Sequence, residues 1–169
     1  FFGFIDCVWN HNQNYADTPK FLFFSGYAFQ LMCRFFQIGR VTQREVQPSA
    51  FAPVSRTWAA KKDYCFEQIP DQFFVNDSSK WGVIEPDLHL LAFLEAQITA
   101  VRRLGEEEQR EEIESIRIGD YIMGMQGKPE VLVKQKSPRG TVKPQRIDLL
   151  ARFLNEAAFQ LRRQSSLVA

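Results

Sequence analysis

The sequence predicts a mainly α-helical domain of the α+β type, with one small β-hairpin around residues 116–134. Three observations lead to this class. Apolar residues recur at steps of three and four along several segments, which is the spacing of amphipathic helices. Only the segment 116–134 alternates apolar and polar residues around turn signals, as a hairpin does. The length of 169 residues suits a single domain spanning 1–169, because no repeat or linker divides the chain.

The first elements lie in the most apolar part of the chain. Residues 1–9 form a short apolar segment that fits either a strand or a helix. A candidate N-cap precedes Pro19, so a helix is predicted from Pro19 to about Ile38, with Gly39 as its stop. Apolar residues occupy nearly every face of this segment, so we expect the helix to lie at the centre of the fold.

Three further helices are predicted along the rest of the chain. A helical stretch covers 55–69 and ends before a proline. The strongest helical periodicity covers 86–101, where leucine, isoleucine and valine recur at steps of three and four. A last amphipathic helix is predicted over 144–163. The last two helices are expected to pack against the aromatic helix of residues 19–38.

The predicted hairpin has two apolar arms. Ile116, Ile118 and Ile122 form the first part of the alternating pattern, and Val131 and Val133 form the second. Gly-Asp and Gly-Lys-Pro sequences supply turns between them. This is the only convincing β-structure that the sequence indicates.

Composition narrows the class of protein. Lys and Arg total 21 against 20 Asp and Glu, and 45% of residues are hydrophobic, which excludes a globally disordered chain and a uniformly basic nucleic-acid coat. Three cysteines do not make a disulfide framework, so we expect a cytoplasmic protein with reduced thiols. The most apolar window, 21–36, is shorter than the ~20 residues of a spanning helix, so a buried core helix is favoured over an interfacial membrane helix.

The phenylalanine content suggests the first functional interpretation. There are 16 Phe against 4 Tyr and 3 Trp, and Phe has a large apolar surface with no polar group. Such a surface must be buried in a core or against a partner. We therefore predict a non-enzymatic protein–protein interaction or assembly subunit with an aromatic-rich helical core, in a homo-oligomer or with a protein partner. Its expected interface residues are Phe1, Phe2, Phe4, Phe21, Phe24 and Phe35.

Charge asymmetry supports an alternative function. The segment 106–114 is strongly acidic, whereas 134–163 is basic and could form a sub-module of its own. The basic segment could bind the phosphate backbone of a nucleic acid, although no aromatic residues interleave with its loop cations. The residues expected to bind are Lys134, Lys136, Arg139, Lys143 and Arg146.

A cysteine-dependent enzyme is the second alternative. Cys7 and His11 are the only thiol and imidazole close together in the sequence, and a catalytic thiolate needs a neighbouring base. The same two residues with Cys33 and Cys65 could supply four zinc ligands, but their spacing is scattered. No phosphate loop and no G-x-S-x-G motif is present. We therefore expect no metal or cofactor and assign no catalytic residue.

Overall fold

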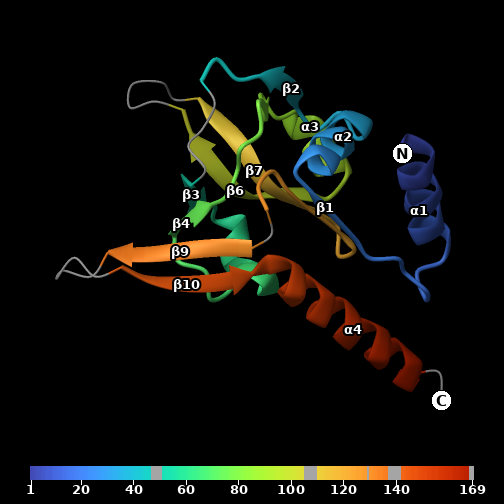
Figure 1. The fold of residues 1–169 in the computed structure, drawn as a ribbon. Coiled ribbons are helices and arrows are strands. Elements are labelled where there is room, and N and C mark those ends of the chain that lie inside the picture. Colours follow the sequence, from blue (N-terminus) through green and yellow to red (C-terminus); the bar gives the residue numbers. More distant parts are fainter. Residues whose placement is uncertain (47–50, 105–109, 129, 137–141, 168–169) are drawn as a thin grey trace.

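The computed structural model describes residues 1–46, 51–104, 110–128, 130–136 and 142–167. These residues form an α/β fold around an eight-stranded mixed sheet, with a separate two-stranded sheet (Figure 1). The predicted mainly α-helical class with one hairpin is therefore wrong. Several apolar segments that have helical spacing in the sequence are strands, because pairing within the sheet outweighs their local preference.

The elements follow one another in this order: α1 (Phe2–Asn14), β1 (Leu22–Ser25), α2 (Tyr27–Phe35), β2 (Arg40–Gln43), β3 (Ala52–Arg56), the 3-10 helices η1 (Ala59–Lys62) and η2 (Tyr64–Phe66), β4 (Gln72–Val75), β5 (Trp81–Ile84), α3 (Leu88–Phe93), β6 (Ala96–Arg103), β7 (Glu111–Ile118), β8 (Ile122–Met125), β9 (Glu130–Lys136), β10 (Val142–Asp148) and α4 (Leu149–Leu167).

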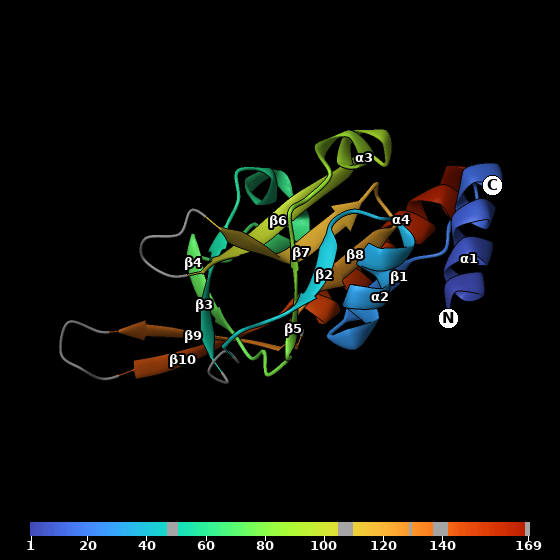
Figure 2. The ribbon, with the colours of Figure 1, turned by 90° about the horizontal axis from the view of Figure 1, so that it is seen from above.

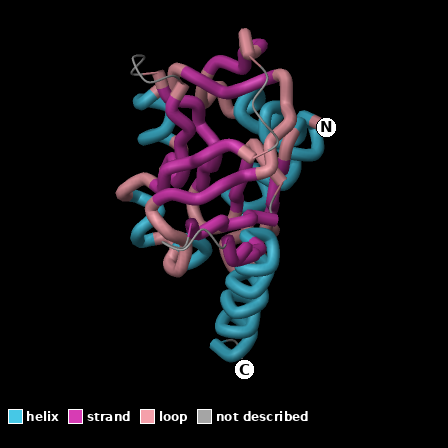
Figure 3. The backbone as a smooth tube through the Cα atoms, turned by 60° about the vertical axis from the view of Figure 1, so that its left-hand side comes forward, coloured by secondary structure: helices cyan, strands magenta, loops and turns pink. Residues whose placement is uncertain are grey.

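The large sheet has the strand order β1-β8-β7-β6-β3-β4, and β5 joins it by pairing with β7 and with β2. Strand β1 runs parallel to β8, whereas the other pairs are antiparallel. Seen from above, the sheet curls strongly (Figure 2). Strands β9 and β10 form the second sheet, which projects from one side of the body (Figure 1). Helix α4 projects from another side toward the C-terminus (Figures 1 and 3).

The predicted helix over 19–38 is wrong in its first part. Leu22–Ser25 is a strand, paired residue by residue with Ile122–Met125 of β8. Gly26 then takes a φ of 57°, a left-handed conformation that interrupts the chain before α2 begins at Tyr27. The apolar run that resembled one central helix is therefore a buried strand, a sharp turn and a shorter helix.

Two other predicted helices are also largely strands or short turns. The 55–69 stretch contains the end of β3 and the two 3-10 helices. In the 86–101 stretch, α3 covers only Leu88–Phe93, and the chain turns at Glu95 with a φ of 51°. Strand β6 follows and lies between β3 and β7. A residue pattern cannot show such pairing, because the partners lie far away in the sequence.

Part of the predicted hairpin exists. Strands β7 and β8 pair on either side of a turn at Gly119, whose φ is 51°. Val131 and Val133, however, lie in β9 and pair with β10. The first residues of the predicted helix 144–163 belong to β10, and α4 starts only at Leu149, after Asp148 caps the helix by accepting a hydrogen bond from the Ala151 amide at 3.0 Å. The apolar residues 1–9 begin α1.

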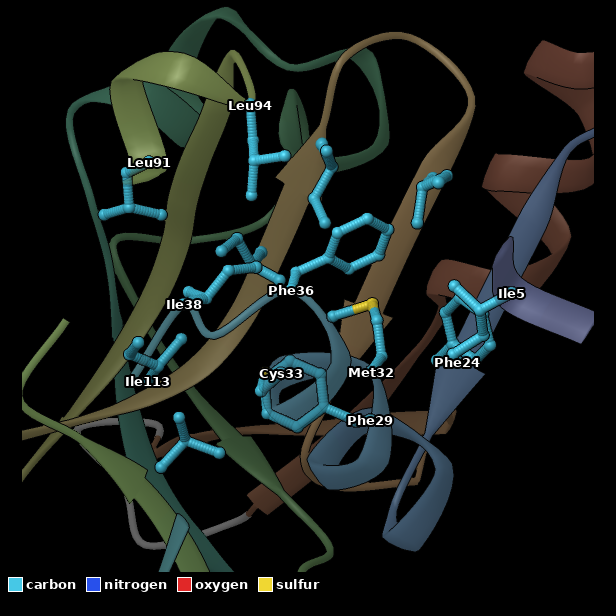
Figure 4. Close-up of a cluster of buried hydrophobic side chains, with 14 residues drawn as sticks. Ile5, Phe24, Phe29, Met32, Cys33, Phe36, Ile38, Leu91, Leu94 and Ile113 are labelled. Carbon is cyan, nitrogen blue, oxygen red and sulfur yellow. The ribbon is translucent and has the colours of Figure 1, made fainter. Parts of the chain in front are cut away.

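Two hydrophobic clusters cover the two faces of the sheet. One lies between the sheet and helices α1, α2 and α3, with Phe29, Met32 and Ile113 among its members (Figure 4). The other lies between the sheet, η2 and the first turns of α4, around Phe66 and Phe153. Much of the aromatic content is thus buried within the one chain. The buried phenylalanines are Phe24, Phe29, Phe36, Phe66, Phe73 and Phe153, and the exposed ones are Phe1, Phe2, Phe4, Phe93 and Phe159.

Candidate binding site at a strand–helix elbow

The turn between β1 and α2 has the geometry of an elbow, in which a strand leads sharply into a helix. Gly26 stands at its tip with φ 57° and ψ −122°. In enzymes with a nucleophile elbow, the catalytic side chain stands on such a strained strand-to-helix turn. Glycine supplies none. A Cβ atom built on Gly26 would have only the Gln126 carbonyl oxygen near it, at 3.9 Å, so the space above the turn is open.

Strand β8 forms the second wall of the elbow. The Gly26 amide donates to the Met125 carbonyl at 3.0 Å, which continues the parallel β1–β8 register and places Gln126 beside the turn. The first helical hydrogen bond of α2 runs from the Gln30 amide to the Gly26 carbonyl, at 3.3 Å, and no side chain caps the helix. The amides of the first turn therefore point toward the elbow without intrahelical acceptors, at the positive end of the helix dipole.

Gln126 is the unusual residue of this wall. Its side chain is 1% exposed, and neither its Oε1 nor its Nε2 atom has a hydrogen-bond partner within the described residues. A Cβ on Gly124 would lie 2.6 Å from Phe29 Cδ2 of α2, so alternation along the strand places Gln126, two residues on, toward the same helix. A buried amide without partners costs about 1–3 kcal/mol. Gln126 thus has a buried donor and a buried acceptor without partners on the α2 side of β8, and its backbone lies next to Gly26.

A network of five buried charges lies behind the elbow. Arg44 makes a bidentate pair with Glu112, at 2.8 and 2.7 Å, and its Nη1 lies 2.8 Å from Asp77 Oδ2. Arg102 Nη2 contacts Asp77 Oδ2 and Glu114 Oε2, each at 2.8 Å. None of the five side chains is more than 6% exposed. We call these residues the charge network: Arg44, Asp77, Arg102, Glu112 and Glu114.

Glu114 connects this network to the elbow wall. Its Oε1 accepts a hydrogen bond from the Gly127 amide at 3.0 Å, and its backbone carbonyl accepts one from the Gln126 amide at 2.7 Å. Complete burial raises the pKa of the Glu114 carboxyl to about 7, while the neighbouring Arg102 acts in the opposite direction. Glu114 therefore changes its charge near neutral pH.

The open side of the elbow carries an exposed aromatic ring and a cation. Tyr27, the first residue of α2, is 70% exposed. Lys128 is also exposed, and its amide donates to the Asn76 carbonyl at 3.0 Å, which fixes the backbone of the wall beyond Gln126. The elbow is thus flanked by the first amides of α2 and by the backbone of Gln126, with exposed Lys128 two residues further along the wall.

The residues of the predicted Cys7–His11 centre are not joined. Both lie in α1, but His11 Nε2 contacts the Thr18 carbonyl at 2.7 Å and its ring stacks on Tyr15. No hydrogen bond connects Cys7 with His11 among the described residues. No group of three or more His, Cys, Asp or Glu side chains in the described chain could hold a metal ion.

The other two thiols are buried and held as neutral groups. Cys33 lies inside the cluster beneath α2, where burial raises the pKa of its thiol far above the ordinary value. Burial likewise raises the pKa of the Cys65 thiol to about 12. Neither can supply a thiolate at neutral pH.

Cys65 belongs to a second polar cluster, on the other face of the sheet. Arg117 of β7 binds Asp63 through Nε and Nη2, at 2.5 and 3.0 Å, and its Nη2 lies 3.1 Å from Glu156 of α4. The same nitrogen lies 3.2 Å from the Cys65 sulfur. A cavity of about 740 Å³ adjoins this cluster along α4, lined by residues that include Tyr64, Asp120 and Phe159.

The other predicted site residues fall into two groups. Of the expected interface residues, Phe1, Phe2 and Phe4 are 54%, 44% and 55% exposed, Phe21 and Phe35 are half-buried, and Phe24 is buried. Their role as an interface stays a prediction. Lys134, Lys136, Lys143 and Arg146 belong to β9 and β10, whose side chains lie outside the described part of the structure, as does all of Arg139.

The elbow was not predicted from the sequence, because the G-x-S-x-G motif contains a nucleophile and this turn has glycine instead. One signal was available: a glycine divides the apolar strand LFFS from the helix YAFQLMCRF. Gln126 and the charge network had no comparable signal, because their members come from distant segments.

Comparison with known proteins relates the fold to solved structures. No family model matches the sequence, and no curated protein matches it. The structure is similar to that of a Thermoplasma acidophilum protein assigned as a component of GMP synthase, with a TM-score of 0.61 and 14% identity over 95% of this chain and 69% of that one. It is also similar to a glutamine amidotransferase from Thermotoga maritima, with a TM-score of 0.51 and 12% identity over 95% of this chain and 54% of that one.

These similarities establish a glutamine amidotransferase-type fold. The chain spans about half the length of the Thermotoga enzyme. The prediction of a non-enzymatic assembly subunit with an aromatic-rich helical core is therefore wrong, because the core is built on a sheet and the fold is of the glutamine amidotransferase type. Among the described helices, none has the length and apolarity that crossing a membrane requires.

Proposed function

We propose that this chain is a glutamine amidotransferase-type domain whose elbow binds glutamine, or a closely related carboxamide, reversibly and without a covalent intermediate. The observation that carries the proposal is Gly26. It has the backbone conformation of an elbow, open space above it and no side chain that could attack a substrate.

The chemistry of the elbow favours a carboxamide ligand. A carboxamide has one acceptor oxygen and one donor nitrogen, and the buried Gln126 amide offers the complementary pair. The free amides at the start of α2 suit a carbonyl or carboxylate oxygen of the same ligand. Lys128 adds a positive charge on the exposed side. The name of the Thermotoga relative supports glutamine as the first ligand to test.

Covalent catalysis by a thiol is not part of the proposal. Forming an acyl-enzyme requires a nucleophile close to the reacting carbonyl. Cys33 and Cys65 are buried in the two cores, and Cys7 lies on α1. The elbow can therefore hold a carboxamide, but none of these thiols stands at its tip.

Calorimetric titration with L-glutamine tests the binding. We expect saturable heat with one site per chain, and no binding of L-alanine, which lacks the carboxamide. Gln126→Met keeps the size of the side chain but removes its donor and acceptor, so it should weaken glutamine binding at least about tenfold, the equivalent of one lost hydrogen bond. Absence of glutamine binding to the folded wild-type protein would contradict the proposal.

Gly26→Cys tests the location of the site. In a Cys7→Ser background, a chloroketone analogue of glutamine should alkylate the introduced thiol, with loss of chloride and formation of a thioether. L-Glutamine should protect that thiol, and peptide mapping by mass spectrometry would identify the modified residue. Gly26→Ser has a similar backbone strain without the thiol, so it should remain unmodified. Labelling that glutamine does not prevent would place the ligand elsewhere.

A further inference from the structure

We propose that the charge network positions both walls of the elbow, with Glu114 as the positioning residue, so that ligand binding there is coupled to the protonation of Glu114. This inference rests on the proposed function for its ligand, and its test separates the two.

The β8 wall of the elbow is positioned through Gly127. The Gly127 amide donates to Glu114 Oε1 at 3.0 Å, immediately after Gln126 in the chain. A Cβ on Gly127 would lie 1.9 Å from Val75 Cγ1 and 3.2 Å from Glu114 Oε1, so the backbone is pressed closely against both residues. The backbone position of Gln126, and with it the position of its side-chain amide, therefore depends on the carboxylate of Glu114.

The α2 side of the elbow is positioned through Ser79. Asp77 Oδ1 accepts a hydrogen bond from the Ser79 amide at 2.9 Å, and Arg44 Nη1 donates to the Ser79 carbonyl at 2.8 Å. The Ser79 hydroxyl oxygen in turn accepts a hydrogen bond from Gln30 Nε2 at 2.8 Å. Gln30 lies in the first turn of α2, where its amide bonds the Gly26 carbonyl. The same network thus reaches the helix side of the elbow.

The charge balance identifies Glu114 as the group that titrates. The carboxylates of Asp77 and Glu112 balance the two guanidinium groups, which leaves Glu114 as the third and uncompensated acid. The charged groups that act on it are Arg102 from β6, Arg44 from the segment after β2, Asp77 from the segment after β4 and Glu112 from its own strand. Because Glu114 is completely buried, its pKa is raised to about 7.

Protonation must weaken at least one of the two hydrogen bonds that Glu114 accepts, and on either oxygen it removes the negative charge that strengthens the bond from Gly127. Both oxygens of Glu114 accept hydrogen bonds, Oε1 from Gly127 and Oε2 from Arg102. A proton on either oxygen faces a donor rather than an acceptor, so that hydrogen bond is weakened. The ionised form holds Gly127 and Gln126 in place, and we therefore expect ligand to bind more tightly as the pH rises from about 6 to about 8.

Titrations of the whole chain with L-glutamine at the two ends of this pH range test the coupling. We expect about tenfold tighter binding at the higher pH, a coupling within the usual range for linked sites. Glu114→Gln cannot ionise and should bind with weak, pH-independent affinity. Glu111→Gln, which removes an exposed carboxylate from the same strand, should retain the wild-type pH dependence. A residue with only a structural role would change stability without removing the pH dependence.

The outcomes are separable. Equal affinity at both pH values, or a pH dependence that survives Glu114→Gln, would overturn the coupling while leaving the proposed function intact. If glutamine does not bind at either pH, the proposed function fails, and NMR of the free protein decides on the network. The Gly127 amide and the Gln30 side-chain amide should then titrate together near the Glu114 pKa of about 7, and lose this titration in Glu114→Gln. Independent behaviour of the two signals would overturn the inference.

Discussion

The elbow and the Arg117 cluster are both polar regions in a largely apolar interior, but they differ in how completely their groups are paired. Arg117 is bound by two carboxylates, Asp63 and Glu156, and by the Cys65 sulfur. At the elbow, the Gln126 side-chain amide is more deeply buried but has no partner in the described chain. Buried polar groups whose hydrogen bonds are all made stabilise one conformation, whereas buried polar groups without hydrogen-bond partners can bond to a ligand. We therefore expect the first region to contribute mainly to stability and propose the second as the binding region.

Removing the guanidinium of Arg117 should have the largest effect on stability. Arg117→Met leaves the carboxylates of Asp63 and Glu156 without their cation, which costs about 3–5 kcal/mol when a buried pair is broken. Urea unfolding measures the loss, and glutamine affinity of the folded fraction should not change. Arg40→Met is the matched control, because the Arg40–Glu85 pair is more than half exposed, and solvent screening leaves such a pair little effect on stability. Equal losses in both variants would contradict the assignment.

The pH dependence of stability should show the charge network directly. The folded-state pKa of Glu114 is about 7, above its ordinary value of 4.5, so the folded protein binds a proton that the unfolded chain releases between these values. This contribution to the free energy of unfolding is therefore fully present below pH 4.5 and is lost as the pH rises to 7, by about 3 kcal/mol at most. Urea titrations at several pH values across this window should show that the free energy of unfolding changes less with pH in Glu114→Gln than in the wild type.

This stability change is opposite in sign to the expected change in binding. Raising the pH ionises Glu114, which lowers stability but secures the Gly127 contact. If Glu114→Gln kept the wild-type pH dependence of the free energy of unfolding, another group would dominate the titration.

Adding a methyl group at Gly127 should disturb the elbow wall. In Gly127→Ala the new Cβ would clash with Val75, and overpacking of this kind costs about 1–3 kcal/mol. Because Gln126 precedes this residue, glutamine binding should weaken as well, which calorimetry would measure. Gly3→Ala is a suitable control, since a Cβ there has no neighbour within 4 Å. If the Gly127→Ala protein were destabilised but bound glutamine as the wild type does, the wall at Gly127 would not be part of the binding site.

The smallest expected effect has the opposite sign. Gln126→Met removes a buried amide that lacks partners among the described residues, so the free protein should gain about 1 kcal/mol of stability while it loses affinity for glutamine. Thermal and urea unfolding measure the gain. A clear loss of stability would show that the Gln126 amide is bonded in the free protein, as the Arg117 cluster is.

The sequence indicated local features better than the assembly of the sheet. The turn at Gly119 and the cap at Asp87, whose side chain accepts from the His89 and Leu90 amides, depend on neighbouring residues and could be anticipated. The strand β6 could not, because its residues also have helical spacing and their conformation is decided by pairing with β3 and β7.

The candidate site could not be predicted from the sequence for a related reason. The segment 21–36 has apolar residues at both the helical spacing and the strand spacing, and only Gly26 marks the change from strand to helix. A search for catalytic motifs passes over a turn whose nucleophile position is glycine. The buried partners of Arg44 and Arg102 come from distant segments, so their pairing appears only in three dimensions.

The central claim is that glutamine occupies the elbow, and a ¹⁵N-resolved NMR titration of the whole chain with L-glutamine tests it most directly. If glutamine binds there, the backbone amides of Tyr27, Ala28 and Phe29 and the Gln126 side-chain amide should show saturable shifts. Shifts confined to residues along α4, such as Asn155, Phe159 and Gln160 beside the neighbouring cavity, would contradict it.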